Sequence, residues 1–99
     1  MDYQVSWSPE ALEDVDGIAE YIAKDSAFYA SAVVSKVKEQ SQSLQHFAER
    51  WHMVPELKNK TIRELFVYSY RLIYRVIGQE VLIIAVIHGK QLLDIDDRL

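Results

Sequence analysis

The fold is decided by one stretch, Tyr70-Arg71-Leu72-Ile73-Tyr74-Arg75-Val76. Tyrosine and aliphatic side chains occupy every second position, and the positions between them hold Arg71, Ile73 and Arg75. A period of two residues is typical of a β-strand whose two faces have different surroundings. We therefore predict a half-buried strand that packs its tyrosine face into the core and presents the guanidinium groups of Arg71 and Arg75 on the other face.

An unbroken apolar run follows this strand after a short turn. Residues 81–87 read Val-Leu-Ile-Ile-Ala-Val-Ile, and the run ends at His88-Gly89-Lys90. Because a strand that is apolar on both faces is usually buried on both, we predict a central strand with helices covering at least one side of the sheet. Gly78 is the natural residue for a positive φ in the turn. A further strand is predicted at residues 62–67, joined to the next by a tight connection at Tyr68-Ser69.

Two amphipathic helices are predicted in the first half of the chain. Ser8-Pro9-Glu10 combines an N-cap candidate, a proline and an acid in the first turn, and apolar residues then recur at helical spacing to about Lys24. A break at residues 25–26 precedes a second helix, predicted over residues 27–47. Helices joined this closely form an antiparallel hairpin. Gly17 costs the first helix up to ~1 kcal/mol against alanine, and we expect another element to cross closely there.

Residues 1–99 are enough for one domain with a single modest core. With a short strand at residues 3–7, the order strand, helix, helix, strand, strand, strand predicts an α+β fold. It comprises an N-terminal strand, an antiparallel helical hairpin and a three-stranded antiparallel meander, with the hairpin packed against a mostly antiparallel sheet. We expect residues 48–60 to fold back onto the domain, and the acidic tail at 92–99 to be a frayed helix or disordered.

Composition excludes several classes of protein. The chain has no cysteine, so disulfides, thiolate metal sites and cysteine nucleophiles are excluded, and the positions of His46 and His52 do not suggest a metal site. We expect neither a metal nor a cofactor. No basic region followed by an apolar stretch begins the chain, and its longest apolar run is far shorter than the ~20 residues of a membrane span. We predict a soluble, cytoplasmic domain that does not associate with membranes.

The net charge of −4 is unevenly distributed along the chain. Residues 1–49 carry three basic against nine acidic residues, a balance of −6, whereas residues 50–90 carry seven against three, a balance of +4. The tail contributes −2. We interpret the basic second half as the functional surface and the acids of the first helix, Asp14 included, as a solvated face.

Several segments together resemble the RelE/ParE superfamily of bacterial toxins. Six segments carry the resemblance. Two belong to the first strand and first helix, one to the segment after the second helix, and three to the later strands: Val5 to Ala11, Ile18 to Ile22, Val54 to Leu57, Ile62 to Leu65, Tyr70 to Val76 and Ile87-His88-Gly89. It extends over nearly the whole chain and is closer to ParE than to RelE. It implies a toxin of a type II toxin–antitoxin module, held inactive by a cognate antitoxin that wraps around it.

The resemblance leaves two functional classes open. ParE-like toxins poison DNA gyrase by binding it, without hydrolytic chemistry, whereas RelE-like and YoeB-like toxins are ribosome-dependent mRNA endoribonucleases. RNA cleavage needs a base, an acid and cations near the phosphoryl oxygens. The candidates for a nuclease site are Glu56 and His88 as base or acid, with Arg71 and Arg75 holding the phosphate.

The ending of the chain favours the gyrase class. Ile87-His88-Gly89 is common in ParE-like toxins, although Lys90-Gln91 stand where many of them carry two arginines. The nucleases usually place catalytic aromatic or basic groups in the tail, where Arg98 is here the only candidate. A net charge of −4 also suits a ribosome-entering nuclease poorly.

We therefore predict a ParE-like toxin that binds DNA gyrase and a cognate antitoxin. The alternative function is an mRNA endoribonuclease, and we expect direct binding to nucleic acid only under that alternative. A non-toxic interaction domain is a third class. Arg71 and Arg75 could equally well pair with acids of the helices or the loop, and His88 is also interpreted as a hydrogen-bonded structural residue. The residues predicted to contact target or antitoxin are Arg63, Arg71, Arg75, His88 and Lys90.

Overall fold

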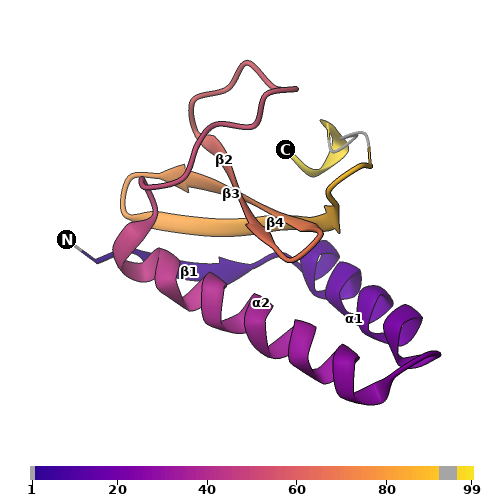
Figure 1. The fold of residues 1–99 in the computed structure, drawn as a ribbon. Helices are drawn as coiled ribbons and strands as arrows, with labels where there is room; N and C mark the ends of the chain where they lie inside the picture. Colours follow the sequence, from indigo (N-terminus) through magenta and orange to yellow (C-terminus); the bar gives the residue numbers. More distant parts are fainter. Residues whose placement is uncertain (1, 92–95) are drawn as a thin grey trace.

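A computed structural model describes residues 2–91 and 96–99, and its order of elements confirms the predicted α+β fold. Figure 1 shows two long helices lying on one side of a four-stranded sheet. The elements are β1 (Gln4–Trp7), α1 (Pro9–Ala23), α2 (Ala27–Phe47), β2 (Ile62–Val67), β3 (Tyr70–Ile77), β4 (Glu80–His88) and a short 3₁₀-helix (Asp96–Arg98). Among the described residues, no helix is long and apolar enough to cross a membrane.

The sheet has the strand order β1-β4-β3-β2, which confirms the predicted central position of β4. This strand runs parallel to β1 and antiparallel to β3, and β3 in turn runs antiparallel to β2. The register pairs Tyr70 with His88 and Arg71 with Ile87, and it shifts after Ile73. The register therefore determines which side chains near the end of β4 share a face with those at the start of β3.

Both helices begin at serine caps, Ser8 as predicted for the first and Ser26 for the second. The Oγ of Ser8 accepts a hydrogen bond from the N–H of Ala11 at 3.1 Å, and the Oγ of Ser26 accepts one from Tyr29 at 3.0 Å. In the turns of the sheet, Gly78 has the expected positive φ of 59°. Tyr68 also has a positive φ, of 54°, a conformation that a bulky residue rarely adopts.

Apolar side chains pack on both faces of the sheet. The helix side holds the main core, in which Leu72 and Tyr74 of β3 are fully buried. The opposite side holds a smaller cluster that includes Ile73 and, from the returning loop, Val54. The predicted tyrosine face of β3 is therefore confirmed as core.

Residues 48–60 fold back onto the domain, as predicted, and extend the sheet beyond β2. The N–H of Glu64 donates to the carbonyl oxygen of His52 at 3.0 Å, and the N–H of Val54 donates to that of Ile62 at 3.3 Å. A bridge between Met53 and Arg63 completes this short pairing. Part of the outer edge of β2 is therefore covered by the loop.

Two expectations need correction or restriction. The close crossing expected at Gly17 is wrong, because a Cβ at this position would meet no atom within 4 Å. Of the predicted frayed or disordered tail, residues 92–95 lie outside the described part of the chain. Residues 96–98 form the 3₁₀-helix, and Arg98 in it donates to the backbone carbonyl of Ile84, in the middle of β4, at 3.1 Å.

Candidate functional site

Arg71 lies in a buried ion-pair network between the sheet and the returning loop. Its Nη1 and Nη2 donate to the two carboxylate oxygens of Glu56 at 2.7 and 2.8 Å. Its Nε donates to Oε1 of Glu64 at 2.8 Å, and Nη2 contacts the same oxygen. The side chains of Arg71 and Glu64 are only 6% and 4% exposed. β3, β2 and the loop therefore each contribute one charged group to this site, in which Arg71 and Glu64 are buried and Glu56 is 33% exposed.

His52 extends this network to the surface. Its Nε2 lies 3.0 Å from Oε2 of Glu64, the carboxylate oxygen that Arg71 does not use, and its side chain is 61% exposed. Four residues, Arg71, Glu56, Glu64 and His52, make up what we call the Arg71 network. It joins residues 52 and 56 of the loop to the sheet by side chains as well as by backbone pairing.

The Arg71 guanidinium is held in its charged form. Hydrogen bonds to Glu56 raise the pKa of Arg71, with further contributions from Glu64, and they outweigh the burial that would lower it. An arginine has five N–H donors, and four hydrogen bonds to the two glutamates occupy four of them. Little capacity is left for binding another anion.

The prediction that β3 presents Arg71 on an open face is therefore wrong. Ile73, two residues along, packs in the loop-side cluster, so the returning loop covers the face that carries Arg71. The alternative, that Arg71 pairs with an acid of the loop, is confirmed. Arg71 supports the position of the loop from within the domain.

Arg63 and Arg75 also bind polar groups of their own chain. Nη1 of Arg63 donates to the backbone carbonyl of Trp51, where the loop begins, and Nη2 of Arg75 donates to that of Leu99 at 3.1 Å. Both residues are half-buried. In contrast to Arg71, neither forms an ion pair among the residues that the structure describes.

His88 and Lys90 are exposed at the end of β4. The ring of His88 lies edge-on to Tyr70, with centroids 5.7 Å apart and planes at 78°. Its Nδ1 accepts a hydrogen bond from the backbone N–H of Lys90 at 3.2 Å. His88 is thus hydrogen-bonded, as one interpretation predicted, but it remains open to a partner on its exposed side.

The structure does not bring the nuclease candidates together. Successive residues of a strand point to opposite faces of the sheet. The register pairs Arg71 with Ile87 and Tyr70 with His88, so His88 lies on the face opposite the Arg71–Glu56 pair. A phosphate bound by one of these groups would not reach the other.

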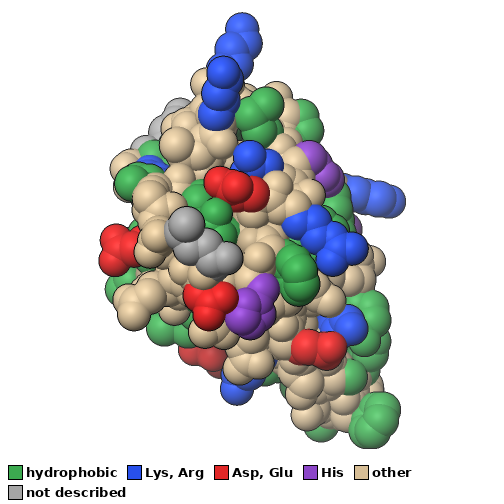
Figure 2. All heavy atoms as spheres, turned by 90° about the vertical axis from the view of Figure 1, so that its left-hand side faces the viewer, with side chains coloured by type: hydrophobic (Ala, Val, Ile, Leu, Met, Phe, Trp, Pro, Cys, Tyr) green, Lys and Arg blue, Asp and Glu red, His purple; other side chains and the backbone are tan. Residues whose placement is uncertain are grey.

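Basic side chains are also scattered at the end of the molecule formed by the N-terminus, the end of α2 and the β3–β4 turn. Figure 2 shows Lys and Arg there interspersed with acidic, histidine and hydrophobic side chains. Arg50 is one example, because its guanidinium lies 5.5 Å from the ring centre of Phe47 and 5.6 Å from that of Trp51. On this end of the molecule the positive charge of the second half does not form a continuous patch.

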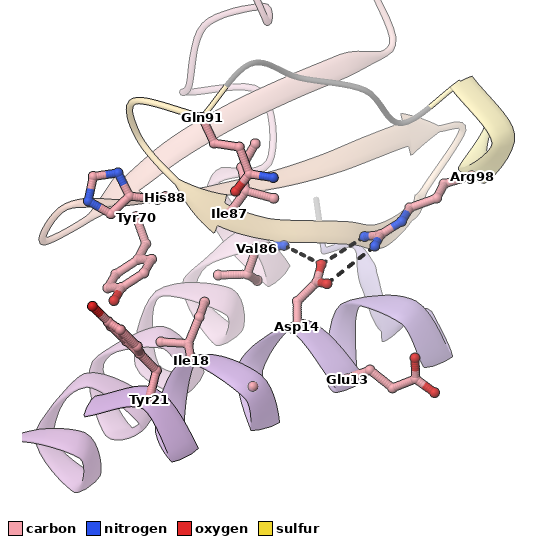
Figure 3. Close-up of a pocket in the computed structure, with 11 residues that line it drawn as sticks. Glu13, Asp14, Ile18, Tyr21, Tyr70, Val86, Ile87, His88, Gln91 and Arg98 are labelled. Carbon is pink, nitrogen blue, oxygen red and sulfur yellow. Dashed lines mark hydrogen bonds and ion pairs between the residues drawn. The ribbon is translucent and has the colours of Figure 1, made fainter. Parts of the chain in front are cut away.

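The sequence did not indicate a groove that lies between α1, the end of β4 and the C-terminal segment. It has a cavity volume of about 590 Å³. Figure 3 shows the side chains that line it from both elements. They comprise carboxylates, aromatic rings, aliphatic groups and one arginine, with Gly17 in the wall: Glu13, Asp14, Ile18, Tyr21, Tyr70, Val86, Ile87, His88, Gln91 and Arg98. We call this the α1–β4 groove.

Asp14 closes one end of the α1–β4 groove. Its Oδ2 accepts hydrogen bonds from the backbone N–H of Val86 at 3.0 Å and from Nη1 of Arg98 at 2.7 Å, and its Oδ1 accepts one from Nη2 of Arg98 at 3.2 Å. The hydrogen bonds from Arg98 to Asp14 are the main cause that raises the pKa of Arg98 above its ordinary value. The interpretation of Asp14 as part of a solvated face is therefore wrong, because it joins α1 to β4 and to the C-terminal segment.

Glu64 is the main site residue that sequence reasoning missed. It lies in a predicted strand on the same face as buried Ile62, and this alternation was the available signal. An ionisable side chain at such an inward position requires a partner of opposite charge. The partner, Arg71, comes from the next strand.

Three solved structures resemble the chain in fold. The chromosomal ParDE toxin–antitoxin system of P. aeruginosa has a TM-score of 0.74 and 23% identity, covering 89% of this chain and 97% of the matched one. The RelBE2 toxin–antitoxin complex of Mycobacterium tuberculosis has a TM-score of 0.66 and 20% identity, with 89% and 99% covered. The YoeB dimer of Staphylococcus aureus has a TM-score of 0.60 and 16% identity, with 89% and 98% covered. These likenesses define the fold as that of RelE/ParE-type toxins.

The sequence narrows this class to one family. The family model described as the ParE toxin of the type II toxin–antitoxin system parDE matches residues 5–93. The chain therefore belongs to the ParE toxin family, which confirms the resemblance found in the sequence. No curated protein sequence matches the chain.

Proposed function

We propose that this ParE-family toxin acts in the cytoplasm by binding and inhibiting DNA gyrase, and that a cognate antitoxin neutralises it. The observation that carries the proposal is the position of the nuclease candidates. Arg71 and Glu56 satisfy each other on one face of the sheet, while His88 lies on the other. General acid–base cleavage of RNA requires these groups to converge on one phosphate. A binding toxin has no such requirement.

A partner protein is supported by the exposed groups at the end of β4. His88 and Lys90 are both accessible there, and we assign them to the surface that contacts target or antitoxin. Arg63 and Arg75 hydrogen-bond to carbonyls of the loop and the C-terminus, and we assign them to the border of that surface. Arg71 contributes indirectly, because it holds the loop in place.

An antitoxin partner is supported by the solved relatives. The P. aeruginosa structure is described as a ParDE toxin–antitoxin system and the M. tuberculosis structure as a RelBE2 toxin–antitoxin complex. The gene next to that of the toxin is the place to look for the partner. Co-expression of its product should yield a stable complex and restore growth.

A supercoiling assay with purified gyrase of the host organism tests the target. We expect the toxin to block supercoiling or to trap cleaved DNA, and the antitoxin to relieve this effect. Absence of both effects at micromolar toxin would refute the gyrase proposal. A parallel translation assay distinguishes the alternative, since ribosome-dependent mRNA cuts that disappear with Glu56→Gln would establish a nuclease.

A further inference from the structure

Gly17 has no explanation within the fold. A glycine inside a helix costs up to ~1 kcal/mol relative to alanine. No atom lies within 4 Å of where its Cβ would be, so no packed neighbour requires the missing side chain. Gly17 does, however, form part of the wall of the α1–β4 groove. A wall without a side chain allows another molecule to approach the helix backbone closely.

The α1–β4 groove has the dimensions and lining of a docking site. Its volume of about 590 Å³ falls in the range of clefts that hold a ligand or an anchoring side chain. Ile18 and Val86 form an apolar floor, and Tyr21 and Tyr70 extend toward each other from the helix and the strand (Figure 3). Tyr21 is 67% exposed, and tyrosines are enriched among the residues that dominate protein interfaces.

The charge around the groove indicates which kind of partner segment would bind there. Glu13 lies in the groove wall, and the exposed surface of the same helix adds Glu10 and Asp16, whereas Glu20 faces a separate groove toward α2. No lysine or arginine occurs in residues 1–23, so no cation of α1 neutralises this rim. Arg98 also lines the groove, but its guanidinium is paired with Asp14, which leaves Glu13 as the wall carboxylate that a partner can meet. Complementarity therefore requires a segment that carries lysine or arginine beside its apolar residues.

We propose that the α1–β4 groove docks an apolar segment flanked by basic residues on the protein that the toxin inhibits. Proteins that handle DNA expose basic surfaces toward phosphate, and an acidic groove is complementary to such a surface. The inference rests on the proposed function and adds the surface through which the toxin contacts its target. The Gly17 backbone lets this segment lie against α1, and the two tyrosines enclose its apolar side chain.

Gly17→Trp tests the groove in the gyrase supercoiling assay. The indole fills the space over α1, so we expect about a tenfold or greater rise in the toxin concentration that gives half inhibition, a loss typical of a blocked anchor position. Leu12→Trp is the matched control, because Leu12 is on the same helix and 52% exposed but does not line the groove. Thermal melting by circular dichroism, run on both variants, checks that each is folded.

Glu13→Lys tests the charge of the rim, and we expect weaker inhibition that low salt does not restore. Unchanged inhibition by Gly17→Trp, or equal weakening by Leu12→Trp, would overturn the proposal. It would also be overturned if Gly17→Trp lost antitoxin binding but kept inhibition, since the groove would then belong to the antitoxin. If the unmodified toxin fails to inhibit gyrase, the proposed function itself fails, and that outcome is visible before any variant is compared.

Discussion

Replacement of Arg71 by methionine should destabilise the toxin severely. The substitution keeps an apolar stem and removes the cation from the Arg71 network. It leaves the Glu64 carboxylate, whose side chain is 4% exposed, without its main hydrogen-bond donors. Removing one partner of a buried ion pair typically costs ~3–5 kcal/mol. Since domains of this size are stable by only about 5–15 kcal/mol, a large share of the total would be lost.

Two further variants test whether the stability lost in Arg71→Met comes from a buried charge without its partner or from a general loss of packing. Arg71→Met combined with Glu64→Leu removes both deeply buried charges, and we expect it to recover most of the lost stability because the carboxylate that remains, Glu56, is 33% exposed and can be hydrated. Arg75→Met is the matched control on the same strand. Arg75 is half-buried and makes one hydrogen bond to the carbonyl of Leu99, so its loss should cost under about 1 kcal/mol.

Urea unfolding followed by circular dichroism measures these differences at pH 7. A cost of 3 kcal/mol corresponds to a fall in Tm of roughly 12–24 °C for a chain of this length. The reasoning is refuted if Arg71→Met costs less than about 1 kcal/mol. It is also refuted if the double variant is as unstable as the single one, because the penalty would then not come from a stranded carboxylate.

Three other substitutions test separate parts of the structure. Gly17→Ala should raise the free energy of unfolding by up to ~1 kcal/mol, since the added methyl meets nothing within 4 Å; a decrease in urea-unfolding experiments would contradict this. Ser8→Ala should cost ~1 kcal/mol by removing the cap of α1, and an unchanged unfolding midpoint would show that the 3.1 Å bond to Ala11 contributes nothing. Tyr74→Phe should cost ~1–3 kcal/mol at pH 7, because the carbonyl of Ala48 loses its 2.7 Å donor. Burial raises the pKa of Tyr74 above its ordinary 10.0. The contribution of its hydroxyl to the free energy of unfolding is therefore full below pH 10, and above pH 10 it falls by ~1.4 kcal/mol for each pH unit. In Tyr74→Phe the free energy of unfolding should therefore fall less steeply at alkaline pH than in the unmodified toxin. If the two proteins lose stability with the same slope between about pH 8 and 11.5, Tyr74 does not have this role.

The fold was predictable because its signals are local. The alternation in residues 70–76 placed one face of β3 in the core, and the fully apolar residues 81–87 indicated the central strand. Ser8 marked the start of α1, and Gly78 marked the turn. Each of these features depends on neighbours within a few residues, which a single sequence displays directly.

The site was less predictable because its contacts join distant segments. The alternation of the strand predicted Arg71 on a presented face, and only the return of the loop brings Glu56 onto it. Asp14 and Arg98 are 84 positions apart, and nothing in either local pattern indicates the other. Gly17 was interpreted as a packing residue, but no neighbour lies within 4 Å of where its Cβ would be.

The strand order has a consequence for the synthesis of the toxin. β1 pairs only with β4 in the described sheet, and the register joins Gln4 to Glu80. The first strand therefore has no partner until the last strand has been made, and contacts so far apart in sequence form slowly. A nascent chain cannot close its sheet while residues 80–88 are still inside the ribosome. Premature termination before β4 should yield an open, protease-sensitive fragment, so a folded toxin requires translation through residue 88.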